Sequence, residues 1–319
     1  MKMKSGIQSI GYSVLAGLTA MTMASSANAA KISLTTSYEV GDYGSTYNYD
    51  GPRLDMTINP DGTNWYFDIG TRRRNHDSGQ RYSRTDLSAG YRFRFENGWI
   101  QPEVKVRRDE TLYKTNTGGR LMNDIYGLEL NHIFSLGGNW GLWGDWSFQM
   151  MKETSETVKK VGNDNVLETI YSDGYTWEIE EGIRYYFSND SRITVSLYDY
   201  GRLADKGNDW GVGGSNWSSQ ARAYYYHKFS NGLSIQPYIR YPLSWGERQQ
   251  WYVSPSMPEG SDQLSKVTRY AFQFTYPVTT AMRLVGEYYL EDIKYKEGYS
   301  NDKDDSKTKY FKLGLNFNF

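Results

Sequence analysis

The chain has 319 residues, a formal net charge of -1, no cysteine and a mean hydropathy of -0.71. Beyond an apolar run near its start, no segment approaches the roughly 20 apolar residues of a membrane-spanning helix, so a helical membrane protein is excluded. The lack of cysteine also excludes a small secreted domain stabilised by disulfides.

The first residues have the pattern of a signal peptide. Lys2 and Lys4 precede an apolar run over 10–23, and Ala27-Asn28-Ala29 is a small-x-small cleavage site. We therefore expect residues 1–29 to be a cleaved signal peptide and residues 30–319 to form one domain in the cell envelope.

Aromatic residues are abundant for so polar a chain, with 10 Trp, 29 Tyr and 12 Phe. Such a composition fits a membrane β-barrel, which has aromatic girdles at both interfaces, an apolar outer band and a wet interior. It fits a secreted carbohydrate-binding or hydrolytic β-protein equally well. The arrangement of the strands has to decide between these two classes.

Alternation of apolar and polar residues predicts strands along the whole mature chain, most clearly over 86–107. Leu87, Tyr91 and Phe93 alternate with polar residues, Glu96-Asn97-Gly98 forms a tight turn, and the alternation resumes after it. The same pattern predicts about fourteen strands, at 32–40, 53–58, 65–74, 86–95, 100–107, 126–130, 140–148, 175–187, 193–197, 220–229, 233–243, 270–276, 282–290 and 311–319.

The connections between these strands alternate in length. Short turns such as Pro60-Asp61-Gly62 and Ser230-Asn231-Gly232 alternate with longer polar segments, which we expect to be loops at 109–120, 153–173, 205–214, 246–264 and 301–306. Tight turns at one end and long loops at the other are typical of an outer-membrane barrel. The sequence thus predicts an all-β fold, a single antiparallel transmembrane barrel of about 14 strands with short periplasmic turns and long extracellular loops.

Two features conflict with this pattern. Pro102, Pro237 and Pro242 fall inside predicted strands, so each should mark a bulge or a strand end. Glu181 falls on the apolar face, where a carboxylate is costly unless it lies near an interface.

Several segments resemble known families. The run from Leu313 to Phe317 before the terminal Phe319 looks like the C-terminal insertion signal of outer-membrane proteins. Residues 177–185 and 220–224 resemble strands of the monomeric outer-membrane porin G group, and 102–105 is similar to the oligogalacturonate-specific porins. The resemblance implies a monomeric outer-membrane channel for oligosaccharides in a Gram-negative bacterium. His76, His132 and His227 do not match the histidines that accompany pH-dependent closure in porin G.

If the apolar face contacts lipid, the polar face lines a channel. Three pairs of basic residues share the polar register of three successive strands: Arg72 and Arg74, Arg92 and Arg94, and Lys105 and Arg107. We therefore expect them to form one basic sector that attracts anions. The alternative is that wall charges pair with one another and only support the barrel. The predicted pore-lining residues are Arg72, Arg74, Arg92, Arg94, Lys105, Arg107, Arg184, Arg222, Arg240, Glu178 and Glu180.

The sequence indicates a porin rather than an enzyme. With three His and no convincing Ser or Asp partner, an outer-membrane hydrolase is a remote alternative, and we expect no catalytic residue, metal site or cofactor. The expected partners are oligosaccharides or other small hydrophilic solutes and outer-membrane lipid, with no nucleic acid. A general or neutral-sugar porin, for maltodextrins or cyclic glucans, remains an alternative to one that favours acidic sugars.

Overall fold

The computed structural model describes residues 30–43, 48–113, 119–161, 164–204, 214–250, 261–297 and 305–319. The expected signal peptide, 1–29, lies outside these residues. Within them, no helix is long and apolar enough to cross a membrane. The strands are β1 (Ala30–Asp42), β2 (Tyr49–Pro60), β3 (Trp65–His76), β4 (Arg81–Tyr91), β5 (Phe93–Phe95), β6 (Gly98–Tyr113), β7 (Gly119–Gly137), β8 (Trp140–Val161), β9 (Asp164–Ser188), β10 (Ser191–Ala204), β11 (Gly214–Lys228), β12 (Ser234–Pro242), β13 (Gly246–Gln250), β14 (Ser261–Pro277), β15 (Met282–Tyr295) and β16 (Ser306–Asn318).

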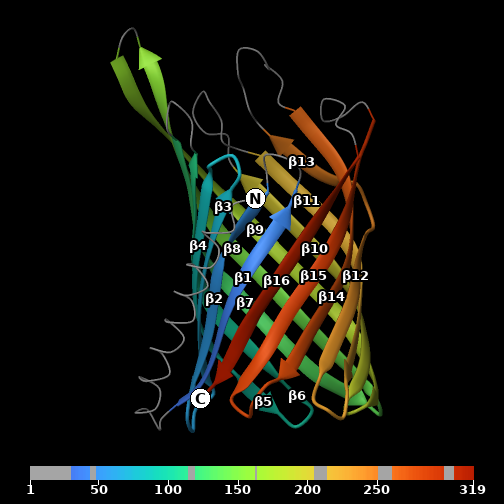
Figure 1. The fold of residues 1–319 in the computed structure, drawn as a ribbon. Helices are drawn as coiled ribbons and strands as arrows, with labels where there is room; N and C mark the ends of the chain where they lie inside the picture. Colours follow the sequence, from blue (N-terminus) through green and yellow to red (C-terminus); the bar gives the residue numbers. More distant parts are fainter. Residues whose placement is uncertain are drawn as a thin grey trace.

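These strands form one closed antiparallel barrel (Figure 1). The 16 described strands occupy fourteen positions, because β4 and β5 share the place beside β6, and β12 and β13 share the place between β11 and β14. Closure comes from β1, which pairs with β16 from Ser33↔Asn318 to Asp42↔Lys309. The predicted barrel of about 14 strands is confirmed.

Most tight turns between the described strands lie at one end of the barrel, as the sequence predicts, although a short turn at 77–80 also joins β3 and β4 at the opposite end. Gly62, Gly137 and Gly232 adopt positive φ values of 71°, 95° and 84°, a conformation that lacks steric cost only in glycine. The turns between β2 and β3, between β7 and β8, and between β11 and β12 can therefore reverse the chain within a few residues.

The opposite end differs from the prediction, because several expected loops are strands. The segment 153–173 continues the ladder of β8 and β9 out to Val161↔Asp164, and the two strands project beyond the rim as a long hairpin (Figure 1). Within 246–264, residues 246–250 form β13 and β14 begins at Ser261. Strands also extend into 109–120, as far as Tyr113 and again from Gly119. Residues 205–213, 251–260 and 301–304 lie outside the described residues.

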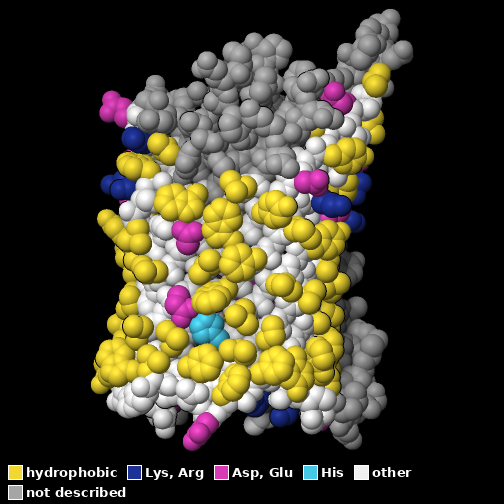
Figure 2. Space-filling view, turned by 180° about the vertical axis from the view of Figure 1, so that it is seen from behind, with side chains coloured by type: hydrophobic (Ala, Val, Ile, Leu, Met, Phe, Trp, Pro, Cys, Tyr) yellow, Lys and Arg dark blue, Asp and Glu magenta, His cyan; other side chains and the backbone are white. Residues whose placement is uncertain are grey.

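The two faces of the wall have opposite chemistry. Figure 2 shows hydrophobic side chains over a broad band of the outer surface, with charged side chains mainly above and below it. Alternate residues of each strand supply this band, and many are more than a third exposed, among them Trp65, Leu87, Val104, Leu128, Phe148, Ile183, Val195 and Tyr270. Such a band is the surface that an outer-membrane barrel presents to lipid.

The prolines interrupt the ladder without shifting its register. Pro102 lies opposite the break between β4 and β5, between the pairs Gly90↔Glu103 and Phe93↔Ile100. Pro237 lies in a gap of the β11–β12 ladder, and Pro242 ends β12, as expected. Proline has no N–H to donate, so each proline occupies a place where a ladder bond is missing.

Glu181 does lie on the outer face, and hydrogen bonds compensate its charge. Trp146 Nε1 donates to Glu181 Oε2 at 2.9 Å, and His132 Nε2 lies 3.2 Å from Oε1. The His132 and Glu181 side chains meet over Gly144, which is the cross-strand partner of both residues. Only glycine leaves room for this contact, because a Cβ at position 144 would lie 2.3 Å from His132 Cε1. His132 is therefore a partner of Glu181 and a neighbour of the aromatic Trp146 ring.

Candidate functional site

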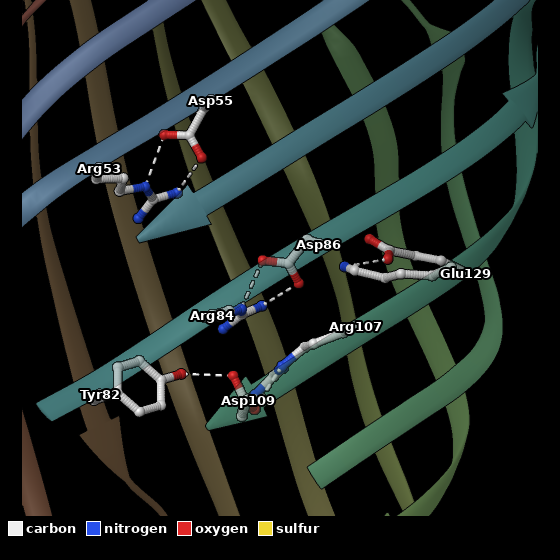
Figure 3. Close-up of polar contacts among 9 residues, drawn as sticks. Arg53, Asp55, Tyr82, Arg84, Asp86, Arg107, Asp109 and Glu129 are labelled. Carbon is white, nitrogen blue, oxygen red and sulfur yellow. Dashed lines mark hydrogen bonds and ion pairs between the residues drawn. The ribbon is translucent and has the colours of Figure 1, made fainter. Parts of the chain in front are cut away.

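The inner wall carries two rows of arginines, each running across three neighbouring strands. In the first row, Arg53 of β2, Arg72 of β3 and Arg84 of β4 are direct cross-strand partners. The outer two are neutralised, because Arg53 Nε lies 2.7 Å from Asp55 and Arg84 Nε lies 2.7 Å from Asp86 (Figure 3). Within the described residues Arg72 has neither a hydrogen bond nor an ion pair, so the centre of the row carries an unpaired positive charge.

The second row repeats this arrangement. Arg222 of β11, Arg240 of β12 and Arg269 of β14 are again direct cross-strand partners. Arg222 Nη1 lies 2.6 Å from Glu180 Oε2, and Arg269 Nε donates to Glu291 Oε1 at 2.8 Å. No carboxylate among the described residues pairs with Arg240, and its buried Nε has no hydrogen-bond partner there.

The two rows lie on roughly opposite walls. Counting around the closed sheet, β3 and β12 are eight positions apart in one direction and six in the other. A solute in the lumen is therefore flanked by Arg72 on one side and by Arg240 on the other.

Carboxylates occupy the wall between the rows. Glu103 of β6 faces Glu129 of β7, and Asp145 of β8 faces Glu180 of β9. Lys105 Nζ approaches Glu129 at 2.7 Å, which neutralises part of this sector. The inner surface thus alternates between basic and acidic sectors around its circumference, an arrangement that sets up a field across the lumen.

Tyrosines complete the inner wall by donating to these carboxylates. Tyr224 Oη donates to Glu180 at 3.0 Å and Tyr238 Oη donates to Glu287 at 2.9 Å. Tyr82 does the same for Asp109 at 2.6 Å (Figure 3), and Tyr310 for Glu39 at 2.9 Å. These hydrogen bonds hold the carboxylate side chains in defined positions on the inner wall.

The structure divides the predicted basic sector of β3 to β6. The backbone N–H of Arg92 donates to the carbonyl oxygen of Asn64, which lies in the tight turn before β3. Arg72 lies eight residues after Asn64, and therefore much further from the tight-turn end of the barrel. Arg92 donates to Gln101 at 2.8 Å and lies between the rings of Tyr66 and Trp99, at 4.3 and 4.0 Å. Its neighbour Arg94 is exposed and contacts Asn64. The expectation of one continuous sector is wrong, because neighbouring strands placed these cations at different heights.

Most other predicted wall cations are paired. Arg74 Nε lies 2.7 Å from Glu39, and Arg107 Nη2 lies 2.6 Å from Asp109. Arg184 stacks on Trp143 at 4.8 Å and lines a cavity of about 140 Å³ with Arg192 and Tyr226. Of the predicted acids, Glu178 accepts from Tyr198 at 3.3 Å, and Glu180 holds Arg222. Arg53, Arg84 and Arg269 have the same polar register, which predicts that they face the lumen, but only their cross-strand neighbours place them in the two rows.

Comparison with solved structures places the fold among outer-membrane barrels. The chain is similar to the CymD monoaromatic hydrocarbon channel, at 10% identity over 91% of this chain and 88% of that one, with a TM-score of 0.54. It is also similar to a Pseudomonas aeruginosa FadL homologue, at 9% identity, 91% and 90% coverage and a TM-score of 0.52. The Pseudomonas putida toluene transporter TodX matches at 9% identity, 91% and 89% coverage and a TM-score of 0.51.

At these identities the likeness concerns the fold alone. No family model and no curated protein matches the sequence. The closed wall, the apolar outer band and these neighbours define the class: the chain is a transmembrane β-barrel of the Gram-negative outer membrane.

Proposed function

We propose that this barrel is a monomeric channel for the diffusion of oligosaccharides, and that it favours acidic ones. The observation that carries the proposal is the pair of unpaired arginines, Arg72 and Arg240, on roughly opposite inner walls. The sequence resemblance to the porin G group and to the oligogalacturonate-specific porins supports the same substrate class.

The preference for anions follows from the electrostatics of the two rows. Three adjacent arginines with only two carboxylate partners leave a net positive charge at each row, and this charge lies against a low-dielectric wall. A guanidinium binds a carboxylate with two parallel hydrogen bonds, so a uronic-acid unit fits it better than a neutral sugar does. Rows on two walls can contact carboxylates on both edges of an extended chain.

The fold neighbours suggest a different cargo, since two of them are named for toluene and monoaromatic hydrocarbons. The inner wall argues against hydrocarbons here. Its described side chains include charged residues on nearly every strand, and moving an apolar solute along such a wall gains little from desolvation. We therefore keep hydrocarbon transport as an outcome of the test rather than as a second proposal.

Single-channel recording in planar bilayers tests the proposal. We expect a trimer of galacturonate to block the current more strongly than maltotriose. In the Arg72→Gln/Arg240→Gln variant, we expect the block by the acidic trimer to weaken by about tenfold, because two charge-assisted contacts are lost, and the block by maltotriose to change by less than about twofold.

A matched control is available next to Arg72 in the sequence. Arg73 lies on the outer face, so Arg73→Gln removes one of the two positive charges lost in the double variant without altering the lumen, and it should leave both blocks unchanged. Equal block by both sugars in the parent would favour the neutral-sugar porin. If vesicles that contain the protein admitted toluene faster than protein-free vesicles but admitted no sugar, the oligosaccharide channel would be overturned altogether.

A further inference from the structure

The upper edge of the apolar band is sharply defined on β6 to β9. Val106, Tyr126, Met150 and Tyr175 form one outward row of cross-strand partners. The next outward row, two residues further from the tight turns, is Arg108, Asp124, Lys152 and Asp173. The change from apolar to charged within one row marks the level at which the lipid tails end and the headgroups of the outer leaflet begin.

The same boundary continues onto β3 and β4, with hydroxyls and arginines in place of ion pairs. Ile69 and Leu87 are partners in the last apolar row, and Thr71 and Thr85 follow. Above them, Arg73 pairs with Ser83, and Asn75 pairs with Arg81. Arg73, Arg81, Thr71 and Thr85 are all exposed. We call these four residues and Ser83 the outer arginine patch.

The height of the patch agrees with this boundary. Arg73 lies eight residues beyond Trp65, the first residue of β3, whose ring contacts Tyr91 at the tight-turn end of the barrel. At about 3.3 Å per residue and a tilt of about 40°, Arg73 stands roughly 20 Å and Asn75 and Arg81 roughly 25 Å above it, close to the top of an apolar band of about 25 Å.

The patch carries charge that the protein does not neutralise. On its β6 side, Arg108 Nε lies 2.6 Å from Asp124, and Arg120 Nε lies 2.6 Å from Glu110, so these charges cancel in pairs. Arg73 and Arg81 make no side-chain hydrogen bond or ion pair within the described part of the chain. They are diagonal neighbours on adjacent strands, about 7–8 Å apart at their Cα atoms.

We propose that the outer arginine patch binds a phosphorylated lipid headgroup of the outer leaflet. Two guanidinium forks, with the hydroxyls of Thr71, Ser83 and Thr85 between them, match the several oxygens of a phosphate. A lipid is the fitting occupant because the patch faces outward directly above the apolar band, where the acyl chains of that lipid would cover Ile69 and Leu87. This site is independent of the inner wall and of the cargo that passes through it.

Titration of the refolded mature protein in neutral detergent, followed by native mass spectrometry, tests the proposal. The probe is bis-phosphorylated lipid A, compared with the same glycolipid after removal of both phosphates. We expect the phosphorylated form to bind the parent at least about tenfold more tightly, as charge-assisted hydrogen bonds predict. In Arg73→Ser/Arg81→Ser, this ratio should fall below about threefold.

The control variant is Lys307→Ser/Lys309→Ser, which removes two exposed cations of β16 and changes the net charge equally. It should keep the parental ratio. If the parent bound both glycolipids equally, the proposed site would be wrong. If both variants lowered the affinity ratio equally, the preference would depend only on the net charge of the protein, and the proposed site would again be wrong.

Discussion

At the scale of single residues, the inner wall depends on carboxylates that serve several partners at once. Glu39 of β1 is 0% exposed, and it accepts hydrogen bonds from Arg74 at 2.7 Å and from Tyr310 at 2.9 Å. Its partners come from β3 and β16, so one side chain connects strands on both sides of the barrel closure. Removing it leaves a half-buried guanidinium without its counter-charge.

Glu39→Ala should therefore lower the free energy of unfolding by about 3 kcal/mol, the usual cost of breaking a buried pair from one side. Glu39→Gln keeps an acceptor and should cost about half as much. Urea unfolding followed by tryptophan fluorescence measures both values. Asp61→Ala, in the exposed turn after β2, is the control and should change stability by less than about 0.5 kcal/mol. If Glu39→Ala matched this control, Glu39 would not be needed for closure.

The outer face shows the same use of multiple partners. Asp199 of β10 accepts hydrogen bonds from Trp177 Nε1, Trp217 Nε1 and Ser219 Oγ at 2.8, 2.9 and 2.8 Å. Together with Glu181, it shows how this barrel carries carboxylates on a surface that faces lipid. Each carboxylate meets indole N–H groups, which also need an acceptor once they are buried.

At the scale of elements, the most distinctive feature is the hairpin of β8 and β9. Its ladder runs without interruption from Trp140↔Tyr185 to Val161↔Asp164, far beyond the row that ends the apolar band at Met150↔Tyr175. Polar composition favoured a loop here, but Thr154, Thr169, Ile170 and Tyr171 are β-branched or aromatic and suit a strand. Only two strands pair in the projecting part, so it adds little to the stability of the barrel.

Replacing residues 157–168 by Asn-Gly should leave the barrel intact, because Glu156 and Thr169 are cross-strand partners that a two-residue turn can join. The shortened protein should keep its β-rich circular dichroism and its heat-modifiable gel migration. It should also keep the parental block by galacturonate trimer. Loss of folding would mean that the projecting strands are needed for assembly.

At the scale of the whole molecule, stability depends on closure. The pairing of β1 with β16 removes both free edges of a sheet that otherwise exposes backbone groups to lipid. The apolar side chains at the end of β16, including Phe317 and Phe319, pack beside β1.

Deleting residues 306–319 should thus abolish folding, and not merely lower the stability in proportion to the number of residues removed. Both β15 and β1 would become open edges, and each unsatisfied backbone group in lipid costs several kcal/mol. The readout is the fraction of protein that becomes heat-modifiable on refolding in detergent, which we expect to fall to the background level. The full-length protein should migrate as a monomer in the same gel, and a folded truncated barrel would contradict the role of closure.

The sequence by itself determined which face each side chain occupies. Strand periodicity of two requires only local information, so Leu87, Arg72 and Asp86 could be assigned to lipid or lumen, and the number of strands followed from counting. The turns that contain glycine could be predicted for the same reason, because a positive φ depends only on the residues of the turn itself.

Only the tertiary structure decided which side chains meet. Whether Arg72 lies beside Arg84 or beside Arg92 depends on the register between β3 and β4, which backbone pairing and barrel closure set together. The same register placed Arg240 between two other arginines and brought His132 to Glu181 across Gly144. Hydrogen bonds between distant segments fix these positions, and the alternation within a single strand carries no information about its offset from the next one.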